Sequence, residues 1–240
     1  MDGVLSAVLA RRGFKAPEDI LDENSGFLGM FSPLFNTSHI THNLGKHYHL
    51  PDVSIKPYAA CLVIHPAIDG LICIRNEHRL EAGAIDRIDL EVSPICLALG
   101  DHAAPKDSLE AKFSIYYCAA VAILAGNAKE SHFTDELVND ARIRNVMQKV
   151  EVNGNASLTE SEAMVKVRSK DGTEYVTQVS GPKGDPGNPL DFDEVAEKFR
   201  DLSKHLLSED DIQQIITMVQ DLEGLDNLTG LLTLCCKGSP

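Results

Sequence analysis

The sequence lacks several features that define whole classes of protein. It has no run of about 18 apolar residues, which disfavours a chain that crosses a bilayer as a helix. It has no glycine-rich loop with phosphate-binding spacing after a predicted strand, and no Gly-x-Ser-x-Gly motif. Nucleotide-dependent enzymes and serine hydrolases are therefore poor candidates.

Positive charge is also scarce. The chain carries 22 Lys and Arg against 36 Asp and Glu, a formal net charge of −14. Neutralising nucleic-acid phosphates needs a basic patch, and these cations are scattered among the acids, so we expect no nucleic-acid partner. An anionic substrate would need a local positive pocket inside this acidic protein.

Cys-x-x-Cys pairs are absent as well. The six cysteines lack the regular spacing of a small secreted scaffold, so we expect them to be reduced and to act mostly as small core hydrophobes. Residues 1–12 predict an amphipathic helix without the charge order and cleavage site of a signal peptide. We therefore expect an intracellular protein, cytoplasmic or mitochondrial, with no membrane partner.

The patterns that are present alternate between helical and strand periodicity. The predicted elements are, in order, helices at 2–12 and 17–21, a turn at 23–28, a buried helix at 58–74, a strand at 85–97, a buried helix at 112–124, a helix from Thr134, strands at 150–152, 163–167 and 173–179, and helices at 192–206, 210–222 and 225–234. Asp171-Gly172 lies between two alternating segments and is a strong hairpin signal. We expect a sheet of at least four strands.

The order of these elements predicts an α+β fold. Residues 181–189 hold so many prolines and glycines that no regular element is expected there, which makes this stretch the clearest boundary in the chain. We expect the helical parts at 1–50 and 184–240 to pack together and the α+β domain to occupy 51–183.

Three short motifs gather side chains suited to a small carboxylate substrate. They are Lys56-Pro57-Tyr58, His65-Pro66-Ala67-Ile68-Asp69 and, about fifty residues later, Phe113-Ser114-Ile115-Tyr116-Tyr117. An ammonium can pair with a carboxylate, an imidazole can carry a proton near neutral pH, and a phenol can donate a hydrogen bond. Each has a structural alternative, in which the lysine is a solvated residue at a helix start and the rings are core residues.

These motifs resemble the MmgE/PrpD family, which includes 2-methylcitrate dehydratase and cis-aconitate decarboxylase. The resemblance covers nearly the whole chain and fits the C-terminal half of such an enzyme. The further matching pieces are Gly13-Phe14 with Pro17 and Ile20-Leu21, Gly26-Phe27, Leu44-Gly45, Ala141-Arg142-Ile143, and Gly184-Asp185-Pro186 through Lys198-Phe199. It implies that a small α/β-sandwich-like lid domain is inserted between segments of a mostly helical domain.

The resemblance also implies a function. We expect a lyase similar to 2-methylcitrate dehydratase, acting on a small di- or tricarboxylate by proton abstraction and elimination without a cofactor. The implied catalytic residues are His65 and Tyr117, and the implied substrate-binding residues are Lys56, Tyr58 and Cys61. The family's N-terminal half, with its aspartate and histidine motif, has no counterpart in this sequence, so the pocket of this chain is expected to be incomplete.

Two residues depart from the family pattern. Some decarboxylase-like members carry a histidine where this chain has Cys61, and a thiol does not replace an imidazole as a proton carrier unless its pKa is lowered. This argues mildly against decarboxylation. Tyr116 stands where the family often has proline, which leaves open whether Tyr116 or Tyr117 points into the pocket.

A group of histidines invites a metal hypothesis, since His39, His42, His47 and His49 are closely spaced. Their spacing matches no strong zinc signature, and no cysteine is near. We expect a structural or surface role for them and no metal.

Four hypotheses about the chain remain open. It is the C-terminal half of a dehydratase-like lyase, a split enzyme completed by a separately encoded N-terminal half, a non-catalytic subunit of this fold, or a member that decarboxylates, epimerises or isomerises its substrate. Family members are commonly dimers, which makes a homodimer a further expectation.

Overall fold

The computed structural model describes residues 2–18, 20, 26–32, 36 and 38–236. Contacts divide the chain into two units, Met1–Pro51 and Asp52–Pro240. In the predicted helical piece at 17–21, residues 17, 18 and 20 are described and are not helical, while residues 19 and 21 lie outside the described residues. Of the predicted turn at 23–28, residues 23–25 lie outside the described residues, and a short helix begins at Phe27. Within the described part, no helix combines the length and apolar character needed to cross a membrane.

The first unit contains short helices. They are α1 (Asp2–Arg11), α2 (Phe27–Phe31), α3 (Ser38–Thr41) and the start of a 3₁₀ helix at Leu50–Asp52. The helix predicted at 2–12 is confirmed. None of its residues is buried, and Val4 is 72% exposed, so the apolar side chains of α1 are not part of a core within the described residues.

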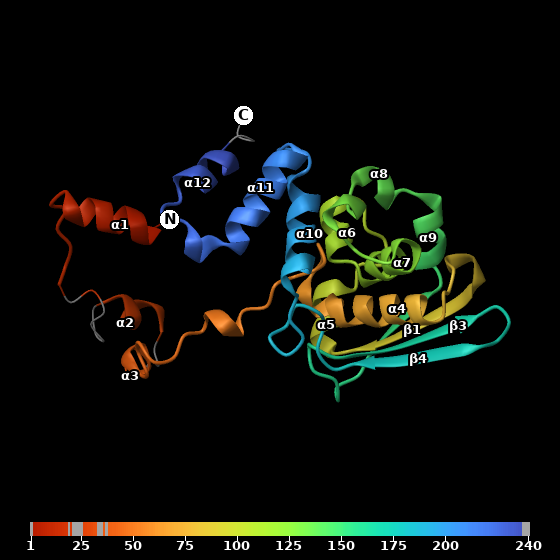
Figure 1. Cartoon of the computed structure of the whole chain (residues 1–240). Helices are drawn as coiled ribbons and strands as arrows, with labels where there is room; N and C mark the ends of the chain where they lie inside the picture. Colours follow the sequence, from red (N-terminus) through yellow and green to blue (C-terminus); the bar gives the residue numbers. More distant parts are fainter. Residues whose placement is uncertain (1, 19, 21–25, 33–35, 37, 237–240) are drawn as a thin grey trace. The chain divides into compact units, whose positions relative to one another are not determined.

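The second unit is built on a four-stranded mixed sheet (Figure 1). Its strands are β1 (Ile85–Val92), β2 (Val150–Gly154), β3 (Ala163–Ser169) and β4 (Glu174–Val179), in the order β2-β1-β3-β4. β1 runs parallel to β2 and antiparallel to β3, and β3 and β4 form the predicted antiparallel hairpin. The α+β class and the four strands expected from the sequence are confirmed.

The two faces of the sheet differ in chemistry. On β3, Ala163, Val165 and Val167 are fully buried, while the residues between them face outward. The outward face is exposed to solvent and carries ion pairs between charged side chains on the same and neighbouring strands. These ion pairs are Arg87–Asp89, Arg87–Glu151, Lys166–Glu174 and Arg168–Asp86.

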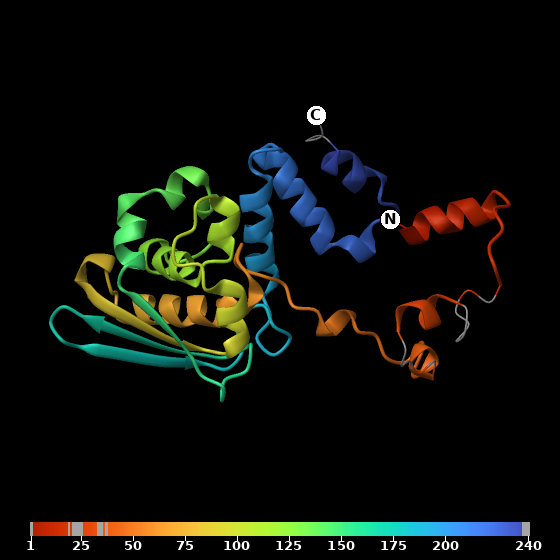
Figure 2. The same cartoon turned by 180° about the vertical axis from the view of Figure 1, so that it is seen from behind.

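Helices cover the buried face, as both views show (Figures 1 and 2). α4 (His65–Glu77) lies across β3 and β4 and packs against α7 (Ile115–Ala125), which also contacts α9 (Ala141–Met147). Gly70 permits the close approach of α4, because a Cβ there would lie 2.6 Å from Cγ2 of Val165. The smaller helices are α5 (Pro94–Gly100), α6 (Ser108–Lys112), α8 (Asp135–Val138) and 3₁₀ turns at Leu62–Ile64, Ala82–Ala84 and Glu130–His132.

Three predicted elements are corrected by the structure. The helix expected at 58–74 begins only at His65, because the backbone amides of Ala59 and Cys61 donate to the carbonyls of Ala128 and Lys112. The strand expected at 85–97 ends at Val92, and Pro94 opens α5 at the position where a proline is favoured. The helix expected at 112–124 is divided between α6 and α7 by the side chain of Ser114, which caps α7.

The C-terminal part of the second unit is helical, as predicted. Its helices are α10 (Phe192–Ser203), α11 (Glu209–Gln220), a 3₁₀ turn at Leu222–Gly224 and α12 (Thr229–Cys235). Asp191 and Glu194 form a reciprocal capping box that fixes where α10 begins. Residues 181–189 form turns with no helix or strand, as expected.

Candidate functional site

A cavity of about 700 Å³ lies in the second unit between the segment 56–59 and α10, with lining residues along most of the length of α10. Its lining comes from four stretches that are far apart in sequence. The lining residues are Lys56, Pro57, Tyr58, Ala59, Lys129, Glu130, Lys183, Leu190, Asp191, Asp193, Glu194, Glu197, Lys198, Asp201 and Leu202. Its size suits a small organic ligand.

Backbone hydrogen bonds hold the 56–59 wall of the cavity. The amide of Ile55 donates to the carbonyl of Gly184 at 2.9 Å, and the amide of Ala59 donates to the carbonyl of Ala128 at 2.9 Å. Pro57 fixes its own backbone between these two bonds. The Lys56 carbonyl accepts from Nζ of Lys198 at 2.8 Å, which ties this wall to α10.

Four lysines line the cavity, and they differ in their partners. Lys183 pairs with Glu194 at 2.9 Å and Lys129 pairs with Glu197 at 2.9 Å. Nζ of Lys56 donates instead to the carbonyl of Ala60 at 3.3 Å. Within the described residues, neither Lys56 nor Lys198 has a carboxylate at ion-pair distance. Their positive charges are the ones available to an anionic ligand.

Six acidic residues line the same cavity, so its lining is formally negative: four lysines against six acids leave a charge of −2. Most of these acids are committed to bonds within the protein. Glu130 pairs with Lys112, Glu194 with Lys183, Glu197 with Lys129 and Asp201 with Lys204, and Asp191 caps α10. The uncommitted positive charge is thus confined to the end where Lys56 and Lys198 meet.

Tyr58 and His65 are linked to Lys56 through shared contacts: Lys56 and His65 both contact the carbonyl of Ala60, and the Tyr58 ring contacts the His65 ring. The hydroxyl of Tyr58 donates to Oδ1 of Asp69, and its ring makes an edge contact with the His65 ring at a centroid distance of 5.2 Å. Burial, followed by the charge of Asp69, raises the pKa of Tyr58 well above its usual range. The phenol therefore stays protonated and serves as a hydrogen-bond donor.

His65 is fully buried at the first position of α4. Its Nε2 lies 3.3 Å from the carbonyl of Ala60, the same oxygen that accepts from Lys56. Burial, with a contribution from the Lys56 charge, lowers the pKa of His65 to about 4, so the ring is neutral at pH 7. A neutral ring that donates from Nε2 keeps a lone pair on Nδ1, and Nδ1 has no hydrogen-bond partner among the described residues.

The other predicted site residues lie elsewhere in the core. Tyr117 is fully buried, and its hydroxyl donates to the carbonyl of His132 at 2.7 Å. The Tyr116 hydroxyl donates to Oδ1 of Asp101 at 2.8 Å. Cys61 is partly buried. None of Tyr116, Tyr117 and Cys61 lines the cavity, so their roles in a site stay predictions from the resemblance.

The structure thus brings together Lys56, Tyr58 and His65. It adds Asp69, Lys183 and Lys198, to which the sequence analysis assigned no role. A signal for Asp69 was available, because a residue four positions after His65 lies on the same face of a helix. No local signal relates Lys183 or Lys198 to Lys56, because more than a hundred residues separate them.

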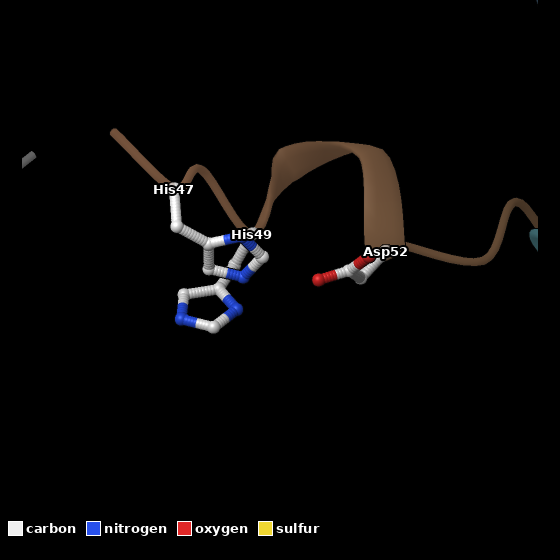
Figure 3. Close-up of side chains that lie close together, drawn as sticks. All are labelled: His47, His49 and Asp52. Carbon is white, nitrogen blue, oxygen red and sulfur yellow. The ribbon is translucent and has the colours of Figure 1, made fainter. Parts of the chain in front are cut away.

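The histidine-rich segment lies outside this cavity. The rings of His47 and His49 are in edge contact at a centroid distance of 4.6 Å, and Figure 3 shows Asp52 next along this short stretch of chain. Ligand atoms of these three exposed residues lie within 4.8 Å of one another. The expected surface location is observed, and a metal role has no support beyond this local proximity.

Comparison of the chain with protein families and with curated proteins gives matches in both. Residues 58–224 match the MmgE/PrpD C-terminal domain. The chain is 27% identical to cis-aconitate decarboxylase of Mus musculus over 98% of its length and 50% of that relative. It is 26% identical to the Homo sapiens protein of the same name, covering 51% of it, and 23% identical to that of Aspergillus terreus, covering 54%. The chain spans about half the length of the curated relatives it matches.

Proposed function

Because the chain belongs to the MmgE/PrpD family, we propose that its cavity binds a small di- or tricarboxylate and forms part of the active site of a lyase. The observation that carries this proposal is the position of Lys56. Its ammonium lines the cavity with the carbonyl of Ala60 as its described partner, and the ammonium of Lys198, which lines the same cavity, donates to the backbone carbonyl of Lys56. Two cations without carboxylate partners are suited to a substrate that brings its own carboxylates.

In the proposed mechanism, Lys56 binds a substrate carboxylate and stabilises the charge that develops next to it. His65 is the proposed proton carrier, because its ring is neutral at pH 7 and has a lone pair on Nδ1. The ring is fully buried and does not line the cavity, so the wall formed by residues 56–59 must move before Nδ1 can meet the substrate. Removal of a proton next to a carboxylate, followed by loss of water, is dehydration. No organic cofactor is needed for this step. Tyr117 would join only if its hydroxyl leaves the carbonyl of His132.

A second candidate is loss of CO₂ in place of water. It is favoured by the relatives, which are named cis-aconitate decarboxylase. In that reaction the electrons of the breaking carbon–carbon bond pass to the neighbouring carbons, CO₂ leaves, and carbon takes up one proton. That proton comes from solvent, and His65, which is neutral at pH 7, would have to bind it before passing it to carbon. Cys61 favours dehydration instead, because some decarboxylase-like members carry an imidazole at this position and a thiol does not replace it as a proton carrier. Epimerisation or isomerisation would use the same proton transfer.

We further propose that a second segment completes the site. A tricarboxylate brings several negative charges, whereas the lining from this chain has a formal charge of −2 with two uncommitted cations. Additional cations must then come from elsewhere: from an N-terminal half, in the same polypeptide or separately encoded, or from a second copy of the chain. If no such segment exists, the chain is a non-catalytic binding subunit of this fold.

The test of this proposal compares two lysine variants. Wild type, Lys56→Met and Lys166→Met are incubated with 2-methylcitrate and with cis-aconitate, alone and with the half of the mouse relative that the chain does not cover. Products are identified by mass spectrometry, and binding of each ligand is measured by calorimetry. Lys166 is the matched control, because it pairs with Glu174 on the outward face of the sheet.

We expect product only in the mixture, and a loss of about 10-fold or more in rate for Lys56→Met, since a charge-assisted hydrogen bond contributes about 1.5–3 kcal/mol. Lys166→Met should match wild type. Product from the chain alone would contradict the incomplete site. No binding and no product in any mixture would reject the lyase. Binding without product would favour the non-catalytic subunit.

A further inference from the structure

Asp69 joins α4 to two segments that line the cavity. It lies on α4, four residues after His65, and is only partly exposed. Its Oδ1 accepts from the hydroxyl of Tyr58, and its Oδ2 accepts from the backbone amide of Lys183 at 2.6 Å. These donors are 11 and 114 residues away in sequence. One carboxylate therefore holds the 56–59 wall and the 181–189 turn at the same time.

The same two segments are joined by weaker links nearby. The Ile55 amide donates to the carbonyl of Gly184, and Oγ of Ser54 donates to Oδ1 of Asp185 at 2.9 Å. Both of these bonds lie before Lys56 in the chain, whereas the bond from Tyr58 lies after it. Lys56 is thus held on both sides. Among the hydrogen bonds of the described residues that join these two segments, only the one through Asp69 reaches the side that carries Tyr58 and Ala60.

The negative charge of Asp69 is stabilised by the hydrogen bonds from Tyr58 and Lys183. Burial, the largest effect, raises the pKa of its carboxyl group, and the bonds from Tyr58 and Lys183 act in the opposite direction. Hydrogen bonds to both oxygens fix the orientation of this partly buried carboxylate. Loss of either donor would leave part of its negative charge without a hydrogen bond, which costs free energy.

From these contacts we propose that Asp69 is a positioning residue for the carboxylate site, which aligns Lys56 toward the cavity by clamping Tyr58 against the 181–189 turn. This inference rests on the proposed function. It also assigns a role to Tyr58: the hydroxyl is used by Asp69, so Tyr58 meets the cavity with its ring and not with its hydroxyl. Asp69 itself does not line the cavity.

The test is a double-mutant cycle on ligand binding. The dissociation constant of 2-methylcitrate is measured by calorimetry for wild type, Asp69→Asn, Tyr58→Phe and the double variant, on the chain alone, because the mixture with the completing half is expected to turn this ligand over. Tyr58→Phe removes a single hydroxyl, so it reports on the clamp even if Asp69→Asn folds poorly. Asp86→Asn is the control, because Asp86 pairs with Arg168 on the outward face of the sheet.

We expect each single variant to weaken binding about 10-fold and the double variant to weaken it no further, because both remove the same link. The control should bind as wild type does. Additive effects, or unchanged binding in both single variants, would overturn the proposal. A merely structural role would lower stability without this non-additivity in affinity.

A second readout works without any ligand. The ¹³Cζ resonance of Tyr58 reports its hydrogen bond to the carboxylate and should move in Asp69→Asn, and exchange of the Lys183 amide should become faster. If these changes occur while wild type binds no carboxylate, the clamp stands and the proposed function fails. If neither change occurs, the clamp itself is rejected.

Discussion

His65 shows how one buried side chain links packing to pH. Its neutral ring lies between Tyr58 and the carbonyl of Ala60, with no room for the hydration that a charged ring needs. The fold therefore holds the ring in the form that can accept a proton, and it does so at a cost in stability whenever the medium becomes acidic.

This gives a prediction for stability against pH. The unfolded chain binds a proton on His65 near pH 6.5, whereas the folded chain binds it only near pH 4, so the free energy of unfolding should rise with pH between these values. A shift of this size corresponds to about 3 kcal/mol at most. Urea unfolding at pH 7 and at pH 4.5 measures the difference.

His65→Gln should lose most of this His65 contribution, because glutamine can donate to the carbonyl of Ala60 without titrating. His205→Gln is the control, since His205 is exposed, and it should follow wild type. An identical pH dependence in wild type and His65→Gln would show that His65 is accessible to water in the folded state.

At the scale of elements, the 181–189 turn depends on one glycine. Gly184 has a φ of +94°, and a Cβ there would lie 2.0 Å from the carbonyl oxygen of Ile55. Ile55 directly precedes Lys56, and its amide donates to the carbonyl of Gly184, so this contact helps to hold the segment that carries Lys56. A side chain at 184 would have to push the two segments apart, in addition to the strain of its backbone.

We predict that Gly184→Ala lowers the free energy of unfolding by about 2–4 kcal/mol and also weakens carboxylate binding. Gly187→Ala is a matched control in the same turn, because a Cβ there meets no atom within 4 Å. It should change stability by about 0.5 kcal/mol or less. Urea unfolding of both variants decides this, and equal losses would show that the close contact at Gly184 is not maintained in solution.

At the scale of the whole molecule, net charge opposes the proposed substrate. The protein carries −14, and a tricarboxylate approaching it is repelled until it reaches the end of the cavity with Lys56 and Lys198. Since salt screens such long-range repulsion over about 8–10 Å at physiological strength, the approach should depend on ionic strength.

We therefore predict that the association rate of 2-methylcitrate rises by roughly 2- to 5-fold between 10 and 150 mM salt, measured by stopped flow. Lys56→Met should mainly raise the dissociation rate, because it removes a contact within the cavity. A fall in the association rate with salt would mean that a positive surface, supplied by a partner, governs entry.

Much of the architecture was determined by sequence alone. Alternating apolar residues predict β3 and β4, the Asp171-Gly172 turn predicts their hairpin, and capping residues such as Thr134 predict helix starts. These are local effects, set by residues within a few positions of each other. The family and the candidate residues Lys56, Tyr58 and His65 also came from short motifs.

Only the tertiary structure decided which side chains share a site. It brought Lys183 and Lys198 to Lys56, gave Asp69 its two donors, and placed Tyr117 in the core with its hydroxyl on a carbonyl. It also shortened the helix predicted at 58–74, because the backbone of residues 59 and 61 bonds to distant segments. Such contacts join residues far apart in the chain, and local periodicity carries no information about them.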